Sequence, residues 1–261
     1  MHPNLAGNRE TGQYGGVTKQ RLDVLLTERG LAESRAKAQG LILAGEVRVD
    51  GEVVTKAGRL CAVDVAIAVA AGPRFVGRGG EKLEAAFGQF ALEVTGGVCV
   101  DVGASTGGFT DCLLQHGAAR VYAVDVGRGQ LDWRLRQDPR VVGIEGRNAR
   151  HLSRDDVPEP IDFGVADVSF ISLTIVLPPV TSLLKPGAGL VTLIKPQFEA
   201  GRAQVGRGGV VRDERVRQSV VERIKAFGTR ELDLEWQGVC ESPLKGPAGN
   251  VEFLAYWRTR G

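Results

Sequence analysis

The stretch VDVGASTGGFT, at residues 100–110, decides how the larger part of this chain folds. An apolar run at residues 98–102, typical of a buried strand, leads directly into a turn rich in glycine and small hydroxylic residues. An amphipathic stretch at residues 108–116 follows the turn and predicts a helix. A turn of this composition between a strand and a helix lets a ligand approach the backbone and the helix N-terminus.

Apolar strands and amphipathic helices alternate from this stretch onward. Strands are predicted at residues 98–102, 121–125, 141–145, 162–167 and 190–195, with helices between them that include residues 108–116 and 173–184. Two more predicted strands, at residues 234–241 and 251–257, follow one another in hairpin order. The pattern predicts an α/β fold with a doubly wound, mostly parallel seven-stranded sheet that ends in an antiparallel strand.

The N-terminal part of the chain follows another pattern. Two short helices are expected, one from Arg21 to Gly30 and one over residues 35–43 with Ser34 as its N-cap. Alternating apolar and polar residues around Asp50-Gly51 predict a β-hairpin. Residues 17–71 therefore read as a small α+β domain.

The segment at residues 72–80 holds four glycines and one proline, a composition typical of a linker. We therefore expect a polar, flexible tail at residues 1–16, the small domain at 17–71, the linker at 72–80 and the larger domain at 81–261. A length of 261 residues is compatible with two unequal domains.

Composition excludes several classes of protein. The net charge of +2 is too small to indicate nucleic-acid binding by the whole surface, so any basic contact must be local.

The four cysteines form no Cys-x-x-Cys pair or Cys/His set typical of zinc sites, which predicts reduced thiols, a cytoplasmic protein and no metal. Neither a signal peptide nor a clean apolar span of about 20 residues is present, and no stable membrane association is expected.

Three ligand classes compete for the glycine-rich turn. A P-loop requires a lysine where Phe109 stands, and the dinucleotide fingerprint requires a glycine where Ser105 stands. The remaining D-x-G-x-x-x-G pattern resembles the first motif of S-adenosylmethionine-dependent methyltransferases. Asp125 ends the next strand, where a carboxylate can accept hydrogen bonds from ribose hydroxyls. Another nucleotide-like ligand, or a degenerate site, is the alternative.

Charged residues at two strand ends are the first candidates for chemistry. Asp167 and Lys195 finish apolar runs, where a charge is costly unless it is paired or functional. The sequence after Asp167 lacks the Pro-Pro-aromatic signature of amine methylation, and no cysteine follows these strands to attack a pyrimidine ring. A hydroxyl acceptor, with a lysine that activates or orients it, is the simplest remaining choice. Lys82 and Glu252 are further candidates.

Seven motifs stand out along the chain: RLD (21–23), SRAKA (34–38), GEVRVDG (45–51), GRGGEKL (77–83), DVGASTGGFT (101–110), DVSFIS (167–172) and KPQFE (195–199). Together they make the sequence similar to the TlyA family, which joins a ribosomal-protein S-four-like RNA-binding domain to an FtsJ-like, Rossmann-like methyltransferase domain.

The resemblance implies 2′-O-methylation of ribose in ribosomal RNA, on cytidines of the small or large subunit. It implies a catalytic tetrad of Lys82, Asp167, Lys195 and Glu252. Members of the family are also known as haemolysins. The residues expected to contact S-adenosylmethionine are Asp101, Gly103, Ser105, Thr106, Gly107, Asp125, Asn148 and Asp167.

Ribosomal RNA or a ribosomal subunit is the expected partner, gripped through its phosphates while the target nucleotide turns out of its stack. The candidate RNA contacts are Arg21, Arg35, Lys37, Arg48, Arg74 and Arg78. Three alternatives stay open at this point: a non-catalytic RNA-binding or assembly protein, a membrane-active haemolysin, and a pseudouridine synthase carrying the same small domain.

Overall fold

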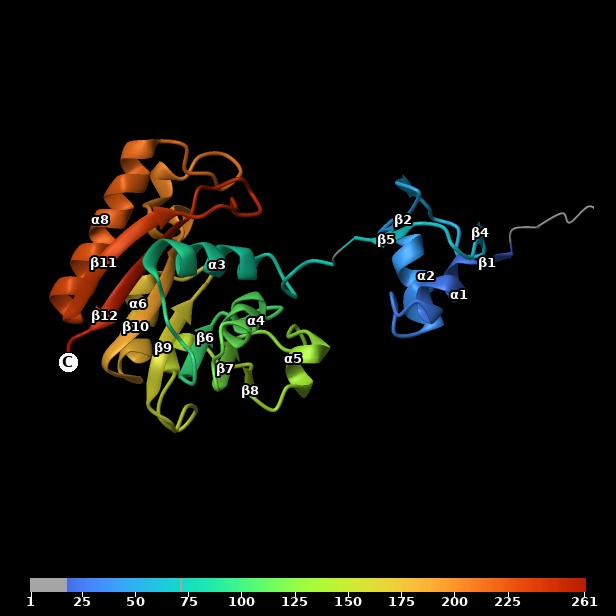
Figure 1. Ribbon diagram of the computed structural model, residues 1–261. Coiled ribbons are helices and arrows are strands. Elements are labelled where there is room, and N and C mark those ends of the chain that lie inside the picture. The colour runs from blue at the N-terminus through green and yellow to red at the C-terminus, as the bar shows by residue number, and fades with distance from the viewer. Residues whose placement is uncertain (1–17, 71) are drawn as a thin grey trace, which may run out of the picture. The chain divides into compact units, whose positions relative to one another are not determined.

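The computed structural model describes residues 18–70 and 72–261, so the tail expected at residues 1–16 lies outside the described residues. The chain divides into two compact units, Met1–Gly72 and Pro73–Gly261. Figure 1 labels most of their helices and strands. Each unit is described by itself.

The smaller unit packs two helices against short strands. Its elements are β1 (Lys19–Arg21), α1 (Leu22–Glu28), α2 (Arg35–Leu43), β2 (Val47–Val49), β3 (Glu52–Val53), β4 (Leu60–Ala62) and β5 (Ile67–Val69). Strands β1 and β4 form one sheet, and β3, β2 and β5 form another. The Ser34 hydroxyl accepts a hydrogen bond from the Lys37 N–H, and Asp50 and Gly51 both have positive φ, which confirms the predicted N-cap and hairpin turn.

The larger unit is built on a seven-stranded sheet in the order β11-β12-β10-β9-β6-β7-β8. Only β12 runs against its neighbours, which confirms the predicted doubly wound, mostly parallel sheet. Its strands are β6 (Val98–Val102), β7 (Arg120–Asp125), β8 (Val141–Glu145), β9 (Ile161–Ala166), β10 (Leu184–Ile194), β11 (Leu234–Glu241) and β12 (Phe253–Thr259). Its helices are α3 (Gly79–Phe90), α4 (Gly108–Gln115), α5 (Trp133–Gln137), α6 (Leu173–Thr181), α7 (Pro196–Glu199) and α8 (Glu214–Glu231), with 3-10 turns η1 (Ala149–His151) and η2 (Arg202–Gln204).

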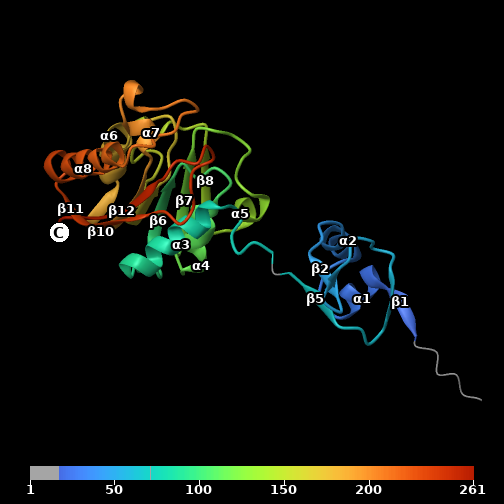
Figure 2. The ribbon, with the colours of Figure 1, turned by 90° about the horizontal axis from the view of Figure 1, so that it is seen from above.

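Both faces of the sheet are covered by helices, and strand residues alternate between two apolar cores. Val100 and Val102 of β6 pack in the core that contains α6 and α8, whereas Cys99 packs in the core that contains α3, α4 and α5. Figure 2 shows α6 and α8 on one face of the sheet and α3 and α4 on the other. Burial on both faces accounts for the continuous apolar runs that mark these strands in the sequence.

The segment expected to be a linker, residues 72–80, is largely packed onto the larger unit. The Phe75 side chain is buried in the core beside α3 and α4, and the Val76 N–H donates to Asp111. Helix α3 already begins at Gly79, and a Cβ on Gly80 would lie 2.2 Å from Phe75 Cγ. Close packing therefore explains glycine at this position.

The helix expected at residues 173–184 is shorter in the structure, because α6 ends at Thr181. The next strand, β10, begins at Leu184 and not at residue 190. An irregular register against β9 between Leu184 and Gly189 interrupts the pattern that the sequence presents. The expected boundary between helix and strand was therefore wrong here.

Replacing Gly80 with alanine should destabilise the larger unit by about 1–3 kcal/mol, because the added methyl group collides with the buried Phe75 ring. The matched control is Gly88→Ala in the same helix, where a Cβ meets nothing within 4 Å. That change should leave the free energy of unfolding unchanged or raise it by about 0.5–1 kcal/mol. Urea denaturation of both variants measures the difference, and equal stabilities would contradict the packing described.

Candidate active site

A crevice opens at the carboxyl ends of the central strands, where ligands bind in open α/β sheets. It consists of two adjoining cavities of about 430 and 290 Å³. The residues that line both are Gly103, Ser105, Asp167 and Ser169. A ligand in the first cavity therefore lies next to a ligand in the second.

The glycine-rich turn forms the floor between the cavities. Gly103 has φ +89°, and a Cβ there would lie 2.4 Å from the Asp167 carbonyl oxygen, so only glycine fits. The Ser105 N–H donates to Asp125 Oδ2 over 2.8 Å, and the Gly127 N–H donates to Asp125 Oδ1 over 2.7 Å. The Asp125 carboxylate is thus fixed at the edge of the larger cavity.

Six of the eight residues predicted to contact the cofactor line this crevice: Gly103, Ser105, Thr106, Asp125, Asn148 and Asp167. The structure does not bring the other two, Asp101 and Gly107, to its wall. Gly107 instead packs against α5, because a Cβ at its φ of +95° would lie 2.2 Å from Leu135 Cδ1. Sequence reasoning also missed three polar residues that line the larger cavity, Gln130, Arg147 and Arg150.

Asp101 is fully buried beneath the turn and supports it from within. The Thr110 hydroxyl donates to Asp101 Oδ2 over 2.7 Å, and Oδ1 has no hydrogen-bond partner in the described part of the chain. Burial raises the pKa of Asp101 to about 7, although the Thr110 hydrogen bond opposes this shift. This side chain holds the start of α4 against β6.

The four residues of the expected tetrad converge as two ion pairs along the smaller cavity. Lys82 Nζ lies 2.6 Å from Glu252 Oε2, and Lys195 Nζ lies 2.5 Å from Asp167 Oδ1. Both lysines are buried to about nine-tenths, and Glu252 is 2 % exposed. They come from α3, from the ends of β9 and β10, and from the residue before β12.

Two more polar side chains contact the tetrad. Lys195 Nζ donates to Ser169 Oγ over 2.9 Å, and the Gln197 side-chain amide reaches Glu252 Oε1 at 3.5 Å. Ser169 stands two residues after Asp167 in DVSFIS, and Gln197 stands two residues after Lys195 in KPQFE, so closeness in sequence to a tetrad residue could have identified both.

Phe170 lies at the mouth of the larger cavity and is 91 % exposed. Its φ of +63° is rare for a bulky residue and is held at a cost of about 1–3 kcal/mol. Its ring centroid is 4.9 Å from that of Phe198. An exposed aromatic ring in a strained conformation beside a crevice is available to stack on a flat ligand.

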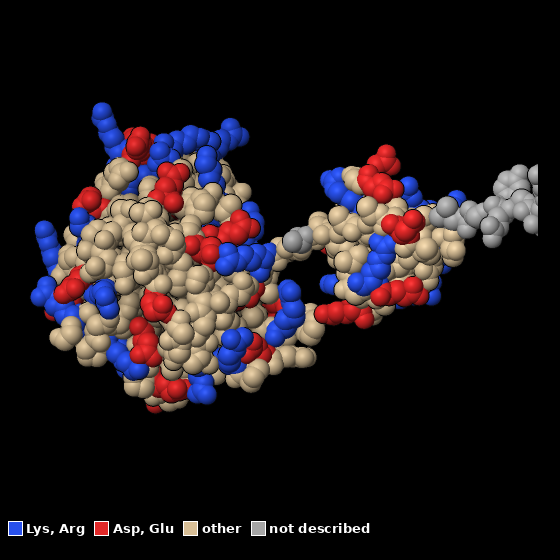
Figure 3. All heavy atoms as spheres, in the orientation of Figure 1, with Lys and Arg blue, Asp and Glu red and all other residues tan. Residues whose placement is uncertain are grey.

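In the smaller unit, two of the predicted RNA contacts are held by one buried carboxylate. Asp23 accepts hydrogen bonds from Arg21, Arg35 and the Gln39 amide, and the Arg21 bond is the main cause that holds the pKa of Asp23 well below its usual range. The two arginines remain about half exposed. Basic and acidic side chains are interspersed over the face of this unit seen in Figure 3, in keeping with the small net charge.

The remaining predicted RNA contacts differ in their surroundings. Lys37 and Arg48 are exposed on the smaller unit, and Arg48 donates to the Gly51 carbonyl. Arg74 pairs with Glu84 on the larger unit, and exposed Arg78 lines the smaller cavity beside Lys82.

The residues present fit the expected cofactor. Gly103 leaves space that a Cβ would fill, and the Asp125 carboxylate is fixed at the end of β7. The cavity beside them continues past Asp167. This crevice on a seven-stranded sheet defines the class of S-adenosylmethionine-dependent methyltransferases.

The chain belongs to the FtsJ-like methyltransferase family, whose model matches residues 75–259, and an S4 domain model matches residues 20–65. It is 46% identical over 246 residues to the 16S/23S rRNA (cytidine-2′-O)-methyltransferase TlyA of Mycobacterium tuberculosis, covering 93% of this chain and 91% of the relative. It is 45% identical to Hemolysin A of Brachyspira hyodysenteriae, covering 91% and 99% of the two chains.

A solved structure from Streptococcus thermophilus, named as a hemolysin, matches 94% of this chain and 90% of its own at 42% identity, with a TM-score of 0.71. The resemblance to the TlyA family and the prediction of an S-adenosylmethionine-dependent methyltransferase are confirmed. Over residues 18–70 and 72–261, no helix is long and apolar enough to cross a membrane.

The Asp101 carboxyl makes stability depend on pH. Its pKa is about 7 when folded and about 3.9 when unfolded, so the folded chain binds an extra proton between these values. This destabilisation is absent below about pH 4, grows as the pH rises toward 7, and reaches about 4 kcal/mol above pH 7. Asp101→Asn, which keeps an acceptor for Thr110, should therefore raise Tm at pH 8 and much less at pH 5.

The control for that measurement is Asp155→Asn, which alters an exposed aspartate. Thermal unfolding followed by circular dichroism at both pH values gives the comparison. A gain in Tm for Asp101→Asn that is the same at pH 5 and pH 8 would contradict a raised pKa.

Proposed function

We propose that this protein methylates the 2′-hydroxyl of cytidine riboses in ribosomal RNA, using S-adenosylmethionine. The observation that carries the proposal is the Lys195–Asp167 ion pair at the junction of the two cavities. The activity named for the Mycobacterium tuberculosis relative supports the substrate. The S4 domain supports RNA as the partner. Because the substrate is ribosomal RNA, the proposed reaction takes place in the cytoplasm.

The larger cavity holds the cofactor in this proposal, with Asp125 accepting its ribose hydroxyls and Gly103 allowing close backbone approach. When bound, S-adenosylmethionine supplies an electrophilic methyl group. Asn148 and Gln130 line the same cavity and are placed to contact the base or the amino-acid portion.

Lys195 holds the acceptor hydroxyl. Its ammonium group donates to Ser169 and forms an ion pair with Asp167, and a further N–H is available for the 2′-oxygen of the ribose. The hydroxyl loses its proton as the new carbon–oxygen bond forms, and the Lys195–Asp167 pair is the group placed to receive that proton. Much of the rate enhancement comes from holding oxygen and methyl carbon in line.

The second ion pair closes the far side of the smaller cavity, the acceptor cavity of this proposal. Lys82 and Arg78 line it together with Lys245, so three cations face the region where the target nucleotide enters. They are suited to the flanking phosphates of a nucleotide turned out of its helix. Glu252 holds Lys82 in place from the opposite side.

The exposed Phe170 ring provides a stacking surface for the base of that nucleotide. RNA-binding proteins stabilise unstacked bases on aromatic side chains, at about 1–3 kcal/mol per base. The ring stands at the end of β9, three residues after Asp167, so a stacked base places its own ribose near the tetrad. This explains why a strained backbone is retained here.

Lys195→Ala should lower the rate of methyl transfer at least about 100-fold while cofactor affinity changes little, because Lys195 lines the acceptor cavity and not the larger one. Lys185→Ala is the matched control, since that lysine pairs with Asp162 away from the crevice. Transfer of labelled methyl groups to ribosomal subunits measures the rate, and calorimetry measures the cofactor affinity.

Full activity in Lys195→Ala would overturn the assignment. Failure of the unmodified protein to bind the cofactor would favour a non-catalytic RNA-binding protein.

Arg35→Ala should weaken binding to ribosomal RNA and reduce the slope of log affinity against log salt by about 0.9, the value for one lost phosphate contact. The arginine is about half exposed and already oriented by Asp23. Lys56→Ala, at another exposed position of the smaller unit, is the control. An unchanged slope in Arg35→Ala would remove this residue from the RNA interface.

A further inference from the structure

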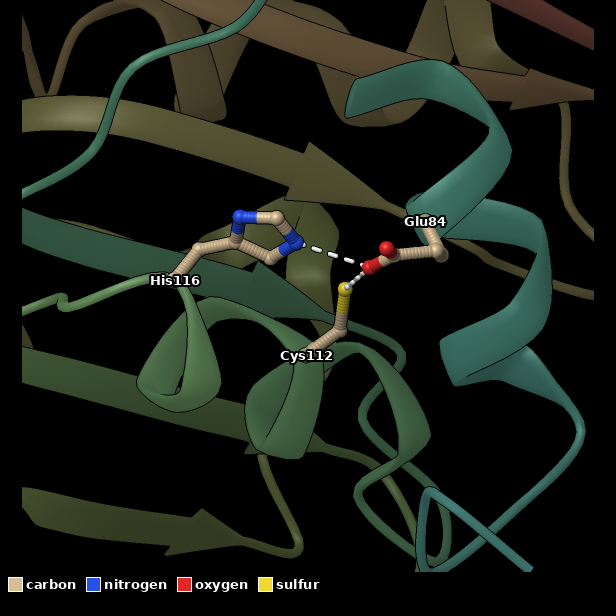
Figure 4. Close-up of side chains that lie close together, drawn as sticks. All are labelled: Glu84, Cys112 and His116. Atoms are coloured by element: carbon tan, nitrogen blue, oxygen red, sulfur yellow. Dashed lines mark hydrogen bonds and ion pairs between the residues drawn. The ribbon is translucent and has the colours of Figure 1, made fainter. Parts of the chain in front are cut away.

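Three side chains of metal-binding type meet on the larger unit outside the crevice. Glu84 of α3, Cys112 of α4 and His116, the C-cap residue of α4, place one ligand atom each within 4.8 Å of one another. Figure 4 shows all three pointing to a common centre between the two helices. None of them lines either cavity of the active site.

The spacing of Cys112 and His116 allows both side chains to bind one metal ion. Cys112 and His116 are four residues apart, so their side chains leave the same face of the helix one turn from each other. Two ligands at this spacing, completed by a third from elsewhere, are a recurring metal-binding arrangement. Helix α3 supplies the third here.

The distances are close to those of a tetrahedral zinc site. Glu84 Oε2 lies 2.7 Å from His116 Nε2 and 3.8 Å from Cys112 Sγ. Ordinary zinc bond lengths with tetrahedral angles place oxygen and nitrogen about 3.4 Å apart, and oxygen and sulfur about 3.6 Å apart. Only a small opening of the Glu84–His116 contact is needed to admit the ion.

The surroundings hold each ligand in place. Arg74 binds Glu84 Oε1, which orients the carboxylate and leaves Oε2 for the metal. The His116 ring stacks on Phe87, with centroids 3.7 Å apart. Cys112 is fully buried, whereas the Glu84 and His116 side chains are about one-third exposed, which gives an ion a path and a water a fourth position.

We propose that Glu84, Cys112 and His116 form a site for a divalent cation of the zinc class, with water as its fourth ligand. The ion replaces the thiol proton, which is released on binding. It links α3, which carries Lys82, to α4, which follows the glycine-rich turn, and so stiffens the helix pair behind the crevice. The proposed site differs from the expectation of no metal, which rested only on the spacing of cysteines and histidines in the sequence.

Cobalt(II) is the probe, because a thiolate ligand gives it a near-ultraviolet charge-transfer band and tetrahedral coordination gives it visible bands. The full chain, stripped of metal by a chelator, should bind one equivalent of cobalt with both signals and release it to zinc. Cys112→Ser should lose the charge-transfer band. His116→Asn and Glu84→Gln should bind cobalt at least about ten-fold more weakly.

The chain has three histidines and four cysteines, which provide matched controls. Cys240→Ser, His151→Asn and His2→Asn should keep the band and the affinity. Absence of the band in the unmodified protein, or its persistence in Cys112→Ser, overturns the site. Should Cys112→Ser fail to fold by circular dichroism, the other two ligand variants decide, and unchanged cobalt affinity in both overturns it.

Discussion

Two lysine–carboxylate pairs held out of water at one edge of the sheet are the constraint on which the larger unit depends. Lys82 with Glu252 and Lys195 with Asp167 place four charges where burial is costly unless every charge keeps its partner. The partners come from α3, β9, β10 and the residue before β12, so the pairs form only when nearly the whole unit has folded. A chemical role explains these buried pairs more readily than a contribution to stability does.

The glycine-rich turn connects these pairs to the cofactor. Because Gly103 lies against the Asp167 backbone, the floor of the larger cavity and the wall of the smaller one are a single junction. In the proposed reaction, a methyl donor on one side and a ribose hydroxyl on the other come within reach of Lys195. In the same proposal, the exposed Phe170 ring and the cations at the smaller cavity extend this junction into a surface for an unstacked nucleotide.

Most of the fold could be predicted because the signals are local. Strands β6 and β8 begin and end where they were predicted, because turn residues bound their apolar runs. The tetrad and its pairing of Asp167 with Lys195 and Glu252 with Lys82 could be proposed from the sequence, but the contact of Ser169 with Lys195 required the geometry.

Other features depend on packing between elements that are distant in sequence, which periodicity does not report. The burial of Phe75 in a segment with a linker composition is one case. Asp101 is another, because alternation along β6 assigns it to a face of the sheet without showing that Thr110 covers it. The meeting of Glu84 with Cys112 and His116 likewise follows from the contact between α3 and α4.

The position of the transferred methyl group tests the central claim most directly. The full chain is incubated with ribosomal subunits and methyl-labelled S-adenosylmethionine, and the RNA is then digested to nucleosides and separated. The account predicts label in 2′-O-methylcytidine. Label on a base carbon or exocyclic amine, or no transfer to RNA by a protein that binds the cofactor, would contradict it.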